Sequence, residues 1–244
     1  MTELNQAKDK NYFIRRDYRV NPVLTFNKDD EERYWTPARI INSSLFQYHV
    51  YLFAREIFLA NKFSSLVDVG CGPGTKAKLL FAGKCNDITL IDQPSIEATV
   101  NRLFPEAQFV PANLEIVPIE TSRKFQMVIC SDVIEHLSDP DKLVMNLKSL
   151  MTYDSLGIIS TPDRELRRGP GSLQSPNKQH VREWDKNELR EYLEFHGLNI
   201  VYQLNLPIKK MGFFQNLLYK ISQPLGKWNK SEWYGNQVIL FRLK

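Results

Sequence analysis

The stretch 67–75 is a short apolar run that ends in three glycines at alternate positions. It reads Val-Asp-Val-Gly-Cys-Gly-Pro-Gly-Thr and is followed by Lys-Ala-Lys-Leu-Leu, a helix-like segment. The pattern predicts a strand, a tight turn and the start of a helix. Because glycine has no Cβ, the main chain of such a turn adopts positive φ and approaches a ligand closely. We therefore expect this turn to bind a nucleotide-like cofactor.

The spacing of the glycines narrows the choice of cofactor. A dinucleotide fingerprint has the form G-x-G-x-x-G, whereas these glycines stand at positions 70, 72 and 74. An acidic strand that leads into G-x-G-x-G resembles motif I of the class I S-adenosylmethionine (SAM) methyltransferases. The resemblance implies SAM as the cofactor, with contacts from Asp68, Gly70, Cys71, Gly72 and Gly74.

A second apolar segment, 88–91, ends in Asp92. In a doubly wound sheet, a carboxylate at this place can accept both ribose hydroxyls of a bound nucleoside. Asp92 could instead cap the helix that follows, but Ser95 is available for that role. We therefore assign Asp92 to the ribose, with Gln93 beside it.

The segment 109–115 resembles the family segment that brackets adenine. This resemblance implies Asn113 and Leu114 as further cofactor contacts, although families often have aspartate where this chain has Asn113. An amide presents an acceptor oxygen, as a carboxylate does, but it adds a donor.

Residues 125–140 resemble motif IV of the same superfamily, whose strand brings the backbone around Ser131 to the reactive end of the cofactor. If a helical turn follows, Asp132, Glu135 and His136 stand at i, i+3 and i+4 and project on one face. Two carboxylates and an imidazole at the carboxyl end of a sheet can hold a divalent cation.

A fourth candidate, His180, begins the His-x-x-Glu-Trp stretch 180–184. This stretch and 160–165 resemble bacterial methyltransferases associated with sugar and polysaccharide synthesis. They also resemble the small-RNA 3′-terminal 2′-O-methyltransferases, which bind a metal through Glu-x-x-Glu-His and a later His. Quinone-biosynthesis O-methyltransferases share a similar carboxylate-x-x-Glu-His pattern.

The resemblance implies that Asp132, Glu135, His136 and His180 hold Mg²⁺ or Mn²⁺. Asp132 stands where the metal-binding groups have glutamate, so this ligand is one methylene shorter. Without a metal, His136 or His180 would act as the general base. Glu135, His136 and His180 are therefore the candidate catalytic residues.

Arginines gather downstream of these motifs. Arg164, Arg167 and Arg168 fall in one predicted loop with nearby glycines, and Arg182 follows. Long glycine-bearing loops beside a site often act as lids. We expect these four arginines to close over the acceptor and to favour an anionic one.

Together these features predict a SAM-dependent O-methyltransferase that acts on a hydroxyl of a sugar, nucleotide sugar or glycoconjugate. Two alternatives stay open. One is a metal-dependent RNA 3′-terminal 2′-O-methyltransferase. The other is a catalytically inactive SAM-binding scaffold or subunit, for which Asn113 and Asp132 are the support in the sequence.

Composition limits the class of protein. The chain has 244 residues, 43% of them hydrophobic, which suits one domain with additions. The net charge of +4 is mild beside that of a dedicated nucleic-acid binder. No uncharged apolar run approaches the roughly 20 residues of a spanning helix, and no secretory signal is visible. The three cysteines lack metal-type pairing, so we expect reduced thiols and a cytoplasmic protein.

Strand-like and helix-like segments alternate along the chain, which predicts a parallel sheet with helices on both faces. The predicted strands are 66–70, 87–92, 107–110, 125–131, 156–161, 198–206 and 237–243, and the predicted helices are 75–83, 95–103, 139–150 and 186–196. The family order makes the last strand antiparallel. The fold class is therefore a Rossmann-like, doubly wound, seven-stranded and mostly parallel sheet.

The N-terminal quarter differs in pattern. Residues 1 to about 35 are polar and charged and predict a loosely ordered arm, whereas 37–60 carry apolar residues at helical spacing. We expect one or two helices there that cap the sheet. This gives an N-terminal arm and helical cap over 1–60 and a methyltransferase domain over 61–244.

Overall fold

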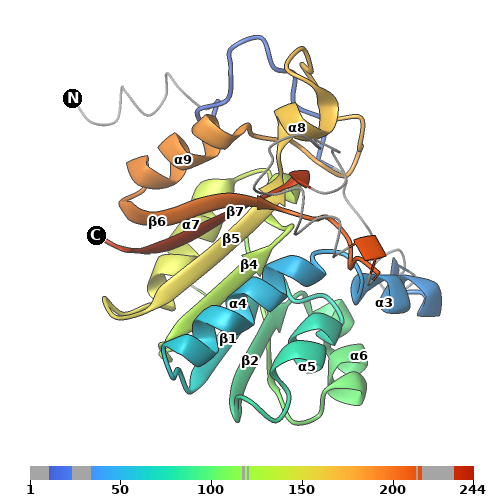
Figure 1. Cartoon of the computed structure of the whole chain (residues 1–244), viewed down its shortest axis with the longest axis vertical. Coiled ribbons are helices and arrows are strands. Elements are labelled where there is room, and N and C mark those ends of the chain that lie inside the picture. Colours follow the sequence, from blue (N-terminus) through green and yellow to red (C-terminus); the bar gives the residue numbers. More distant parts are fainter. Residues whose placement is uncertain (1–10, 24–33, 117–118, 120, 213, 216–233) are drawn as a thin grey trace.

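The computed structural model describes residues 11–23, 34–116, 119, 121–212, 214–215 and 234–244. These residues form a seven-stranded sheet of order β3-β2-β1-β4-β5-β7-β6 (Figure 1). The strands are β1 (Ser65–Val69), β2 (Asp87–Asp92), β3 (Gln108–Pro111), β4 (Met127–Ser131), β5 (Leu156–Pro162), β6 (Leu198–Leu206) and β7 (Asn236–Leu243). Strands β1 to β5 pair in parallel, and β7 is antiparallel to both neighbours. The predicted fold class is confirmed.

The strand order indicates which edge of the sheet binds a ligand. From β1 the chain moves outward to β2 and β3, then returns to pair β4 against the other side of β1. Parallel sheets bind ligands where the order reverses, outside the carboxyl ends of the strands. Val69 is level with Ile91 on one side and with Cys130 on the other. The residues that follow these three strands therefore meet at a common edge.

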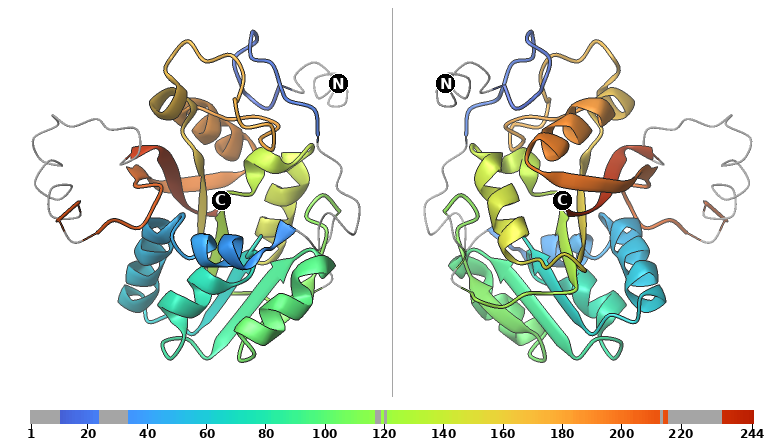
Figure 2. Two further views of the ribbon diagram at one scale, coloured as in Figure 1. Left: turned by 90° about the vertical axis from the view of Figure 1, so that its right-hand side faces the viewer. Right: turned by 90° about the vertical axis from the view of Figure 1, so that its left-hand side faces the viewer.

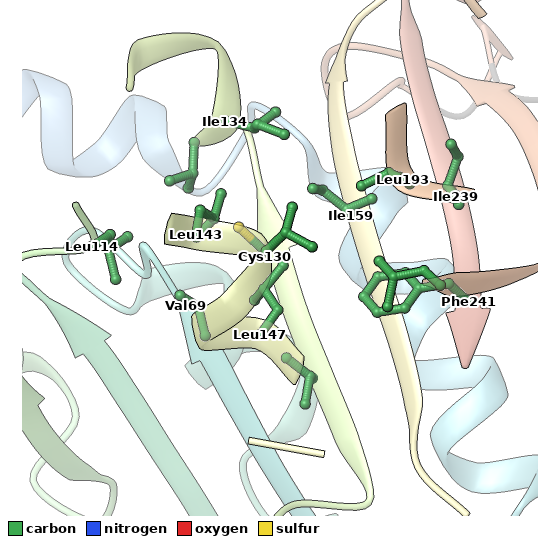
Figure 3. Packing of buried hydrophobic residues seen from close by; sticks show 14 of the residues in the cluster. Val69, Leu114, Cys130, Ile134, Leu143, Leu147, Ile159, Leu193, Ile239 and Phe241 are labelled. Atoms are coloured by element: carbon green, nitrogen blue, oxygen red, sulfur yellow. The ribbon is translucent and has the colours of Figure 1, made fainter. Parts of the chain in front are cut away.

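Helices cover both faces of the sheet (Figures 1 and 2). Helices α4 (Tyr48–Ala60), α5 (Thr75–Phe81) and α6 (Glu97–Leu103) pack on one face, and α7 (Pro140–Ser149) and α9 (Lys186–Phe195) pack on the other. Figure 3 shows the second layer, where Leu143 and Leu147 lie near Cys130. In the described part of the chain, no helix is long and apolar enough to cross a membrane.

Local sequence explains where several helices begin and end. Asp185 caps α9 in a reciprocal box with Glu188, because each side chain accepts from the other's backbone N–H. The predicted helical region 37–60 forms two helices, α3 (Pro37–Ser43) and α4, and Gln47 before α4 has a φ of 54°. The helix predicted at 95–103 starts as a 3₁₀ turn, η1 (Pro94–Ile96).

Part of the N-terminal arm is docked on the domain. Ile14 and Tyr18 are buried in the same core cluster as Trp184, whose indole N–H donates to the Tyr12 carbonyl at 2.8 Å. The prediction of a loosely ordered arm is therefore wrong for residues 11–23, because apolar side chains spaced among the charged ones cover Trp184. Residues 1–10 and 24–33 of the arm lie outside the described residues.

Candidate active site

The glycine loop adopts the predicted strand-turn-helix form. Gly70, Gly72 and Gly74 have φ angles of 76°, 55° and 69°. The Gly70 N–H donates to the Ile91 carbonyl at 2.8 Å, which continues the β1–β2 pairing into the loop. A Cβ on Gly70 would lie 2.2 Å from the side chain of Val133. Only glycine fits there, so the loop packs directly on the chain that follows β4.

Asp92 faces the glycine loop from the end of β2. Its Oδ2 accepts the Gly72 N–H at 2.7 Å, and its Oδ1 accepts the Gln93 N–H at 2.7 Å. The residue before η1 is Gln93, so Asp92 is not the cap of that turn. Each carboxylate oxygen has a second lone pair, and Asp92 is only half-buried. Its place at the carboxyl end of β2, beside the glycine loop, is the place expected for a carboxylate that accepts ribose hydroxyls.

The predicted adenine segment offers few polar side chains to a ligand. Asn113 is exposed, and its Oδ1 accepts the Glu115 N–H at 2.9 Å, which closes a local turn. The Leu114 side chain is buried in the core (Figure 3). A ligand beside this segment would meet the Leu114 backbone, the Asn113 amide and the exposed Gln93.

Asp68 is buried under the loop and has a partner that the sequence did not indicate. The Tyr51 hydroxyl of α4 lies 2.9 and 3.0 Å from the two Asp68 carboxylate oxygens. Burial raises the pKa of Asp68 to about 7. Cys71 is buried beside it, and at the end of β4 the Ser131 hydroxyl hydrogen-bonds the Ser160 hydroxyl at 2.7 Å.

Two histidines distant in sequence meet beside this loop. The rings of His136 and His180 have centroids 4.8 Å apart and planes at 89°. His136 Nδ1 lies 2.8 Å from the Gln179 carbonyl, and His180 Nδ1 lies 2.6 Å from Glu183 Oε1. We assign the ring N–H to Nδ1 in both, because only a donor fits an oxygen acceptor there. In the neutral form of each ring, Nε2 is then the acceptor nitrogen.

Glu135 completes this group. One ligand atom from each of Glu135, His136 and His180 lies within 4.8 Å of the others. Glu135 Oε2 accepts the Thr161 hydroxyl at 2.9 Å, whereas its buried Oε1 finds no hydrogen-bond partner in the described part of the chain. Unsatisfied buried oxygens are costly unless a ligand or ion meets them. The donor set of two imidazoles and a carboxylate fits a divalent cation.

Asp132 lies at the edge of this group and does not join it. Its φ of 55° is left-handed, and its Oδ2 accepts a hydrogen bond from the Gln47 side-chain amide. The helical turn on which the predicted common face depended forms only in part, as a 3₁₀ turn, η2 (Ile134–His136), which does not include Asp132. The Asp132 N–H still donates to the Ser160 carbonyl of β5 at 2.9 Å, so the chain turns sharply after it. Asp132 Oδ1 is buried without a partner among the described residues.

Burial and neighbouring charges set the ionisation of the group. Burial, with the His180 charge, lowers the pKa of His136. Burial alone would lower the pKa of His180, but the Glu183 hydrogen bond and the Glu135 charge outweigh it and raise that pKa. Burial and Glu135 raise the pKa of Asp132 to about 7. At neutral pH, His136 is therefore neutral with a free Nε2.

Glu183 orients His180 and is held in turn by Arg168. Glu183 is fully buried, and its two oxygens lie 3.0 and 3.2 Å from the Arg168 guanidinium. Burial would raise the pKa of Glu183, but the hydrogen bonds from His180 and Arg168 hold it at about 2. Arg168 therefore holds Glu183, which in turn holds the His180 ring.

Two of the four predicted acceptor arginines are buried. Arg164 is 1% exposed and pairs with Glu188 at 2.6 Å. Arg182 is 5% exposed and donates to the carbonyls of Leu137 and Ser138, both at 3.0 Å. Their expected place facing an acceptor does not match this burial, because each guanidinium is occupied in joining segments of the fold. The expected loop is also partly helical, as α8 (Arg164–Arg168).

Arg167 is more accessible to solvent than Arg164 and Arg182. It is half-buried, and its guanidinium makes no hydrogen bond or ion pair with the described residues. Burial and the Arg168 charge lower its pKa, while the charges of Asp132, Glu183 and Glu135 act in the other direction. Arg167 thus lies within electrostatic range of the carboxylate and histidine group.

Several site residues were missing from the sequence interpretation. Glu183 stands inside the His-x-x-Glu-Trp stretch, so its spacing from His180 was a usable signal. Gln47 reaches the site from just before α4, Tyr51 from α4 and Thr161 from β5, and their local sequence carries no comparable signal. The tertiary contacts alone identify them.

The sheet order and the glycine loop beside Asp92 define a class I SAM-dependent methyltransferase. The chain belongs to the methyltransferase domain family, whose model matches residues 39–203.

Relatives by sequence agree with this assignment. The chain is 27% identical over 172 residues to a probable SAM-dependent methyltransferase of Mycolicibacterium smegmatis, covering 70% of this chain and 61% of that protein. It is 25% identical over 178 residues to a ubiquinone biosynthesis O-methyltransferase of Rickettsia bellii, covering 68% and 69%. The chain thus spans about three fifths of the Mycolicibacterium protein.

The fold resembles that of solved methyltransferases. The crystal structure of the small RNA methyltransferase HEN1 matches with a TM-score of 0.61 and 16% identity, covering 82% of this chain and 25% of that one. At this identity the likeness concerns the fold alone.

Proposed function

We propose that this protein is a SAM-dependent O-methyltransferase that acts on a sugar hydroxyl, in a free sugar, nucleotide sugar or glycoconjugate. One observation carries the proposal: Glu135, His136 and His180 converge within 4.8 Å. Glu135 and His136 follow Val133, whose side chain packs against the glycine loop. His180 reaches them from a distant segment. The group that can take up a hydroxyl proton therefore adjoins the cofactor loop.

Methyl transfer is an in-line displacement at the sulfonium. The enzyme must hold the acceptor oxygen near the methyl group, at about 3 to 3.5 Å, and remove its proton. His136 is suited to receive that proton, because its Nδ1 is held by the Gln179 carbonyl and burial keeps the ring neutral. Glu183 holds the His180 ring at right angles to it.

A divalent cation bound by this group would lower the pKa of the acceptor hydroxyl. Glu135, His136 and His180 would supply its ligands, and Asp132 would adjoin through Oδ1, which has no hydrogen-bond partner among the residues described. Imidazole suits later transition metals and carboxylate suits Mg²⁺ and Mn²⁺. A set of two imidazoles and one carboxylate favours Mn²⁺ over Mg²⁺.

Two features support an oxygen acceptor that carries negative charge. Relatives named ubiquinone biosynthesis O-methyltransferase methylate oxygen, as their name states. Arg167 offers a guanidinium without a protein partner among the described residues, and guanidinium matches phosphate and carboxylate. A phosphate-bearing sugar has both the acceptor hydroxyl and the negative charge.

A second candidate is methylation of the 2′-hydroxyl at the 3′ end of RNA. The cluster of two histidines and a glutamate supports it, together with the fold shared with the small RNA methyltransferase HEN1. A terminal ribose is also a sugar hydroxyl, so the same chemistry serves both substrates. The mild charge of +4 favours the smaller acceptor.

The test uses the purified full chain with labelled SAM. The acceptor panel contains sugar phosphates, nucleotide sugars, and RNA oligonucleotides that end in ribose or in 2′-deoxyribose. Each is assayed after chelation and after Mn²⁺ or Mg²⁺ is restored. We expect O-methylation that chelation abolishes and Mn²⁺ restores, without a change in SAM affinity.

Matched variants locate the reaction. Glu135→Gln removes a buried ligand, whereas Glu165→Gln changes an exposed glutamate of α8. We expect the first to lose turnover and the second to keep it. Methylation confined to ribose-ended RNA would select the second candidate. SAM binding with no turnover on any acceptor would refute both and indicate a SAM-binding scaffold.

A further inference from the structure

Lys76 lies at the start of α5, and its side chain extends toward Ser43 and Tyr51. It is the second residue of that helix, directly after the glycine loop, and is half-buried. Its ammonium lies 3.4 Å from the Ser43 carbonyl and 5.1 Å from the centre of the Tyr51 ring. The Tyr51 hydroxyl in turn contacts both oxygens of Asp68. The Lys76 ammonium therefore lies near the Tyr51 side chain that contacts Asp68.

The charges around Lys76 come from three neighbouring strands. Asp68, Asp92 and Asp132 belong to or follow β1, β2 and β4, and the charge of each favours the charged form of Lys76. Burial opposes them and lowers the pKa of Lys76. Among the described residues, no carboxylate lies within ion-pair distance of its ammonium.

Burial of this ammonium has a cost that the Ser43 carbonyl, the Tyr51 ring and the more distant carboxylates offset only in part, since its pKa is lowered overall. A ligand can supply the missing anion. The methionine part of SAM carries an ammonium and a carboxylate on one carbon. Asp68 supplies negative charge beneath Tyr51, which suits the ammonium, and a cation is needed beside it for the carboxylate.

We propose that Lys76 binds the carboxylate of the methionine part of SAM and so selects cofactors with an intact amino acid end. The proposal rests on SAM binding and is independent of the acceptor. The Tyr51 ring and the Ser43 carbonyl hold the lysine in place, and Asp68 binds the adjacent ammonium.

The experiment compares two ligands that differ in this one group. Calorimetry measures the affinity of the full chain for SAM and for decarboxylated SAM, which keeps the sulfonium, the amine and the adenosine. The variants are Lys76→Met, which keeps the length of the side chain without its charge, and Lys84→Met, an exposed lysine beyond the same helix.

We expect the natural protein to prefer SAM, and Lys76→Met to weaken SAM binding roughly 10- to 100-fold, as for a lost charged hydrogen bond. Its affinity for decarboxylated SAM should change less than about threefold. Lys84→Met should resemble the natural protein. Equal losses for both ligands, or no loss for either, would overturn the proposal.

Folding is controlled separately. Thermal unfolding without ligand checks each variant, and Lys76→Arg restores the charge and should recover part of the preference for SAM. If Lys76→Met does not fold, the natural protein still decides, because equal affinity for the two ligands would exclude a carboxylate contact. If instead the carboxylate preference holds but no acceptor is methylated, the proposed function fails while this inference stands.

Discussion

Gln47 donates a hydrogen bond from its side-chain amide to the carboxylate of Asp132, and both residues have left-handed backbones, with φ angles of 54° and 55°. Non-glycine residues in this region carry strain that the surrounding structure must hold. The two residues are 85 positions apart, one before α4 and the other after β4. The strained pair therefore joins the start of α4 to the edge of the group formed by Glu135, His136 and His180.

Comparing two substitutions at Asp132 measures this strain. Asp132→Gly and Asp132→Ala lose the same carboxylate, but only glycine adopts a φ of 55° without cost. We expect the glycine variant to be more stable by about 1 kcal/mol in urea unfolding, while both have impaired turnover. At Asp141, in the first turn of α7, the order should reverse, because alanine is the better helix former. A more stable alanine variant at Asp132 would show that its backbone is not strained.

Asp92 should determine cofactor affinity. Asp92→Ala removes the acceptors placed for the ribose and is expected to weaken SAM binding by about 1 to 3 kcal/mol. Asp87→Ala is the matched control, because Asp87 starts the same strand and pairs with Arg123 at 2.5 Å, far from the loop. Calorimetry on both variants is the measurement. Unchanged SAM affinity in Asp92→Ala would remove this residue from the site.

Asp68 should make stability fall with pH. Its pKa is raised by burial to about 7, so the folded state prefers the protonated form. This contribution is complete below the unfolded pKa, about 3.9, and is lost as pH rises through about 7. Asp68→Asn keeps an acceptor for Tyr51 and cannot titrate. Between pH 5 and pH 8 the natural protein should lose about 2 to 3 kcal/mol more than this variant. Parallel stability curves would contradict the raised pKa.

Asn21 should act on the site through the His180 segment. Its buried amide lies 3.0, 3.1 and 2.9 Å from the carbonyls of Ser175, Asn177 and His180. Asn21→Ala leaves these carbonyls without that donor, which costs about 1 to 3 kcal/mol. We expect weaker Mn²⁺ binding with SAM affinity unchanged. Asn61→Ala, at the exposed end of α4, is the control. Lower stability with unchanged Mn²⁺ binding would limit the arm to a structural role.

Arg167 should affect the acceptor and leave the cofactor alone. Arg167→Met removes a guanidinium that has no partner in the described part of the chain, so the KM for a phosphate-bearing acceptor should rise about tenfold at low salt. The kcat should change little, because the residue binds the acceptor away from the transferred methyl. Arg190→Met is the control, since Arg190 pairs with Glu194 on the exposed face of α9. An unchanged KM would make Arg167 a solvated surface residue.

The sequence by itself determined the sheet and the cofactor loop, because both depend on local patterns. Strands such as β2 matched their predicted limits, since apolar runs bounded by turn residues mark them. Gly70 was predictable because a tight turn with positive φ requires glycine. The meeting of His136 and His180 was predictable only from a resemblance that joined two separate motifs.

Only the tertiary structure decided which polar groups are available to a ligand. Arg164 and Arg167 are equally basic in sequence, yet one is buried against Glu188 and the other has no side-chain partner among the described residues. The proposed carboxylate contact of Lys76 depends on Tyr51, which belongs to another helix and lies beside the ammonium. Such roles depend on burial and on contacts between distant segments. For a charged side chain, periodicity and spacing do not show whether it is buried or which distant segment it contacts.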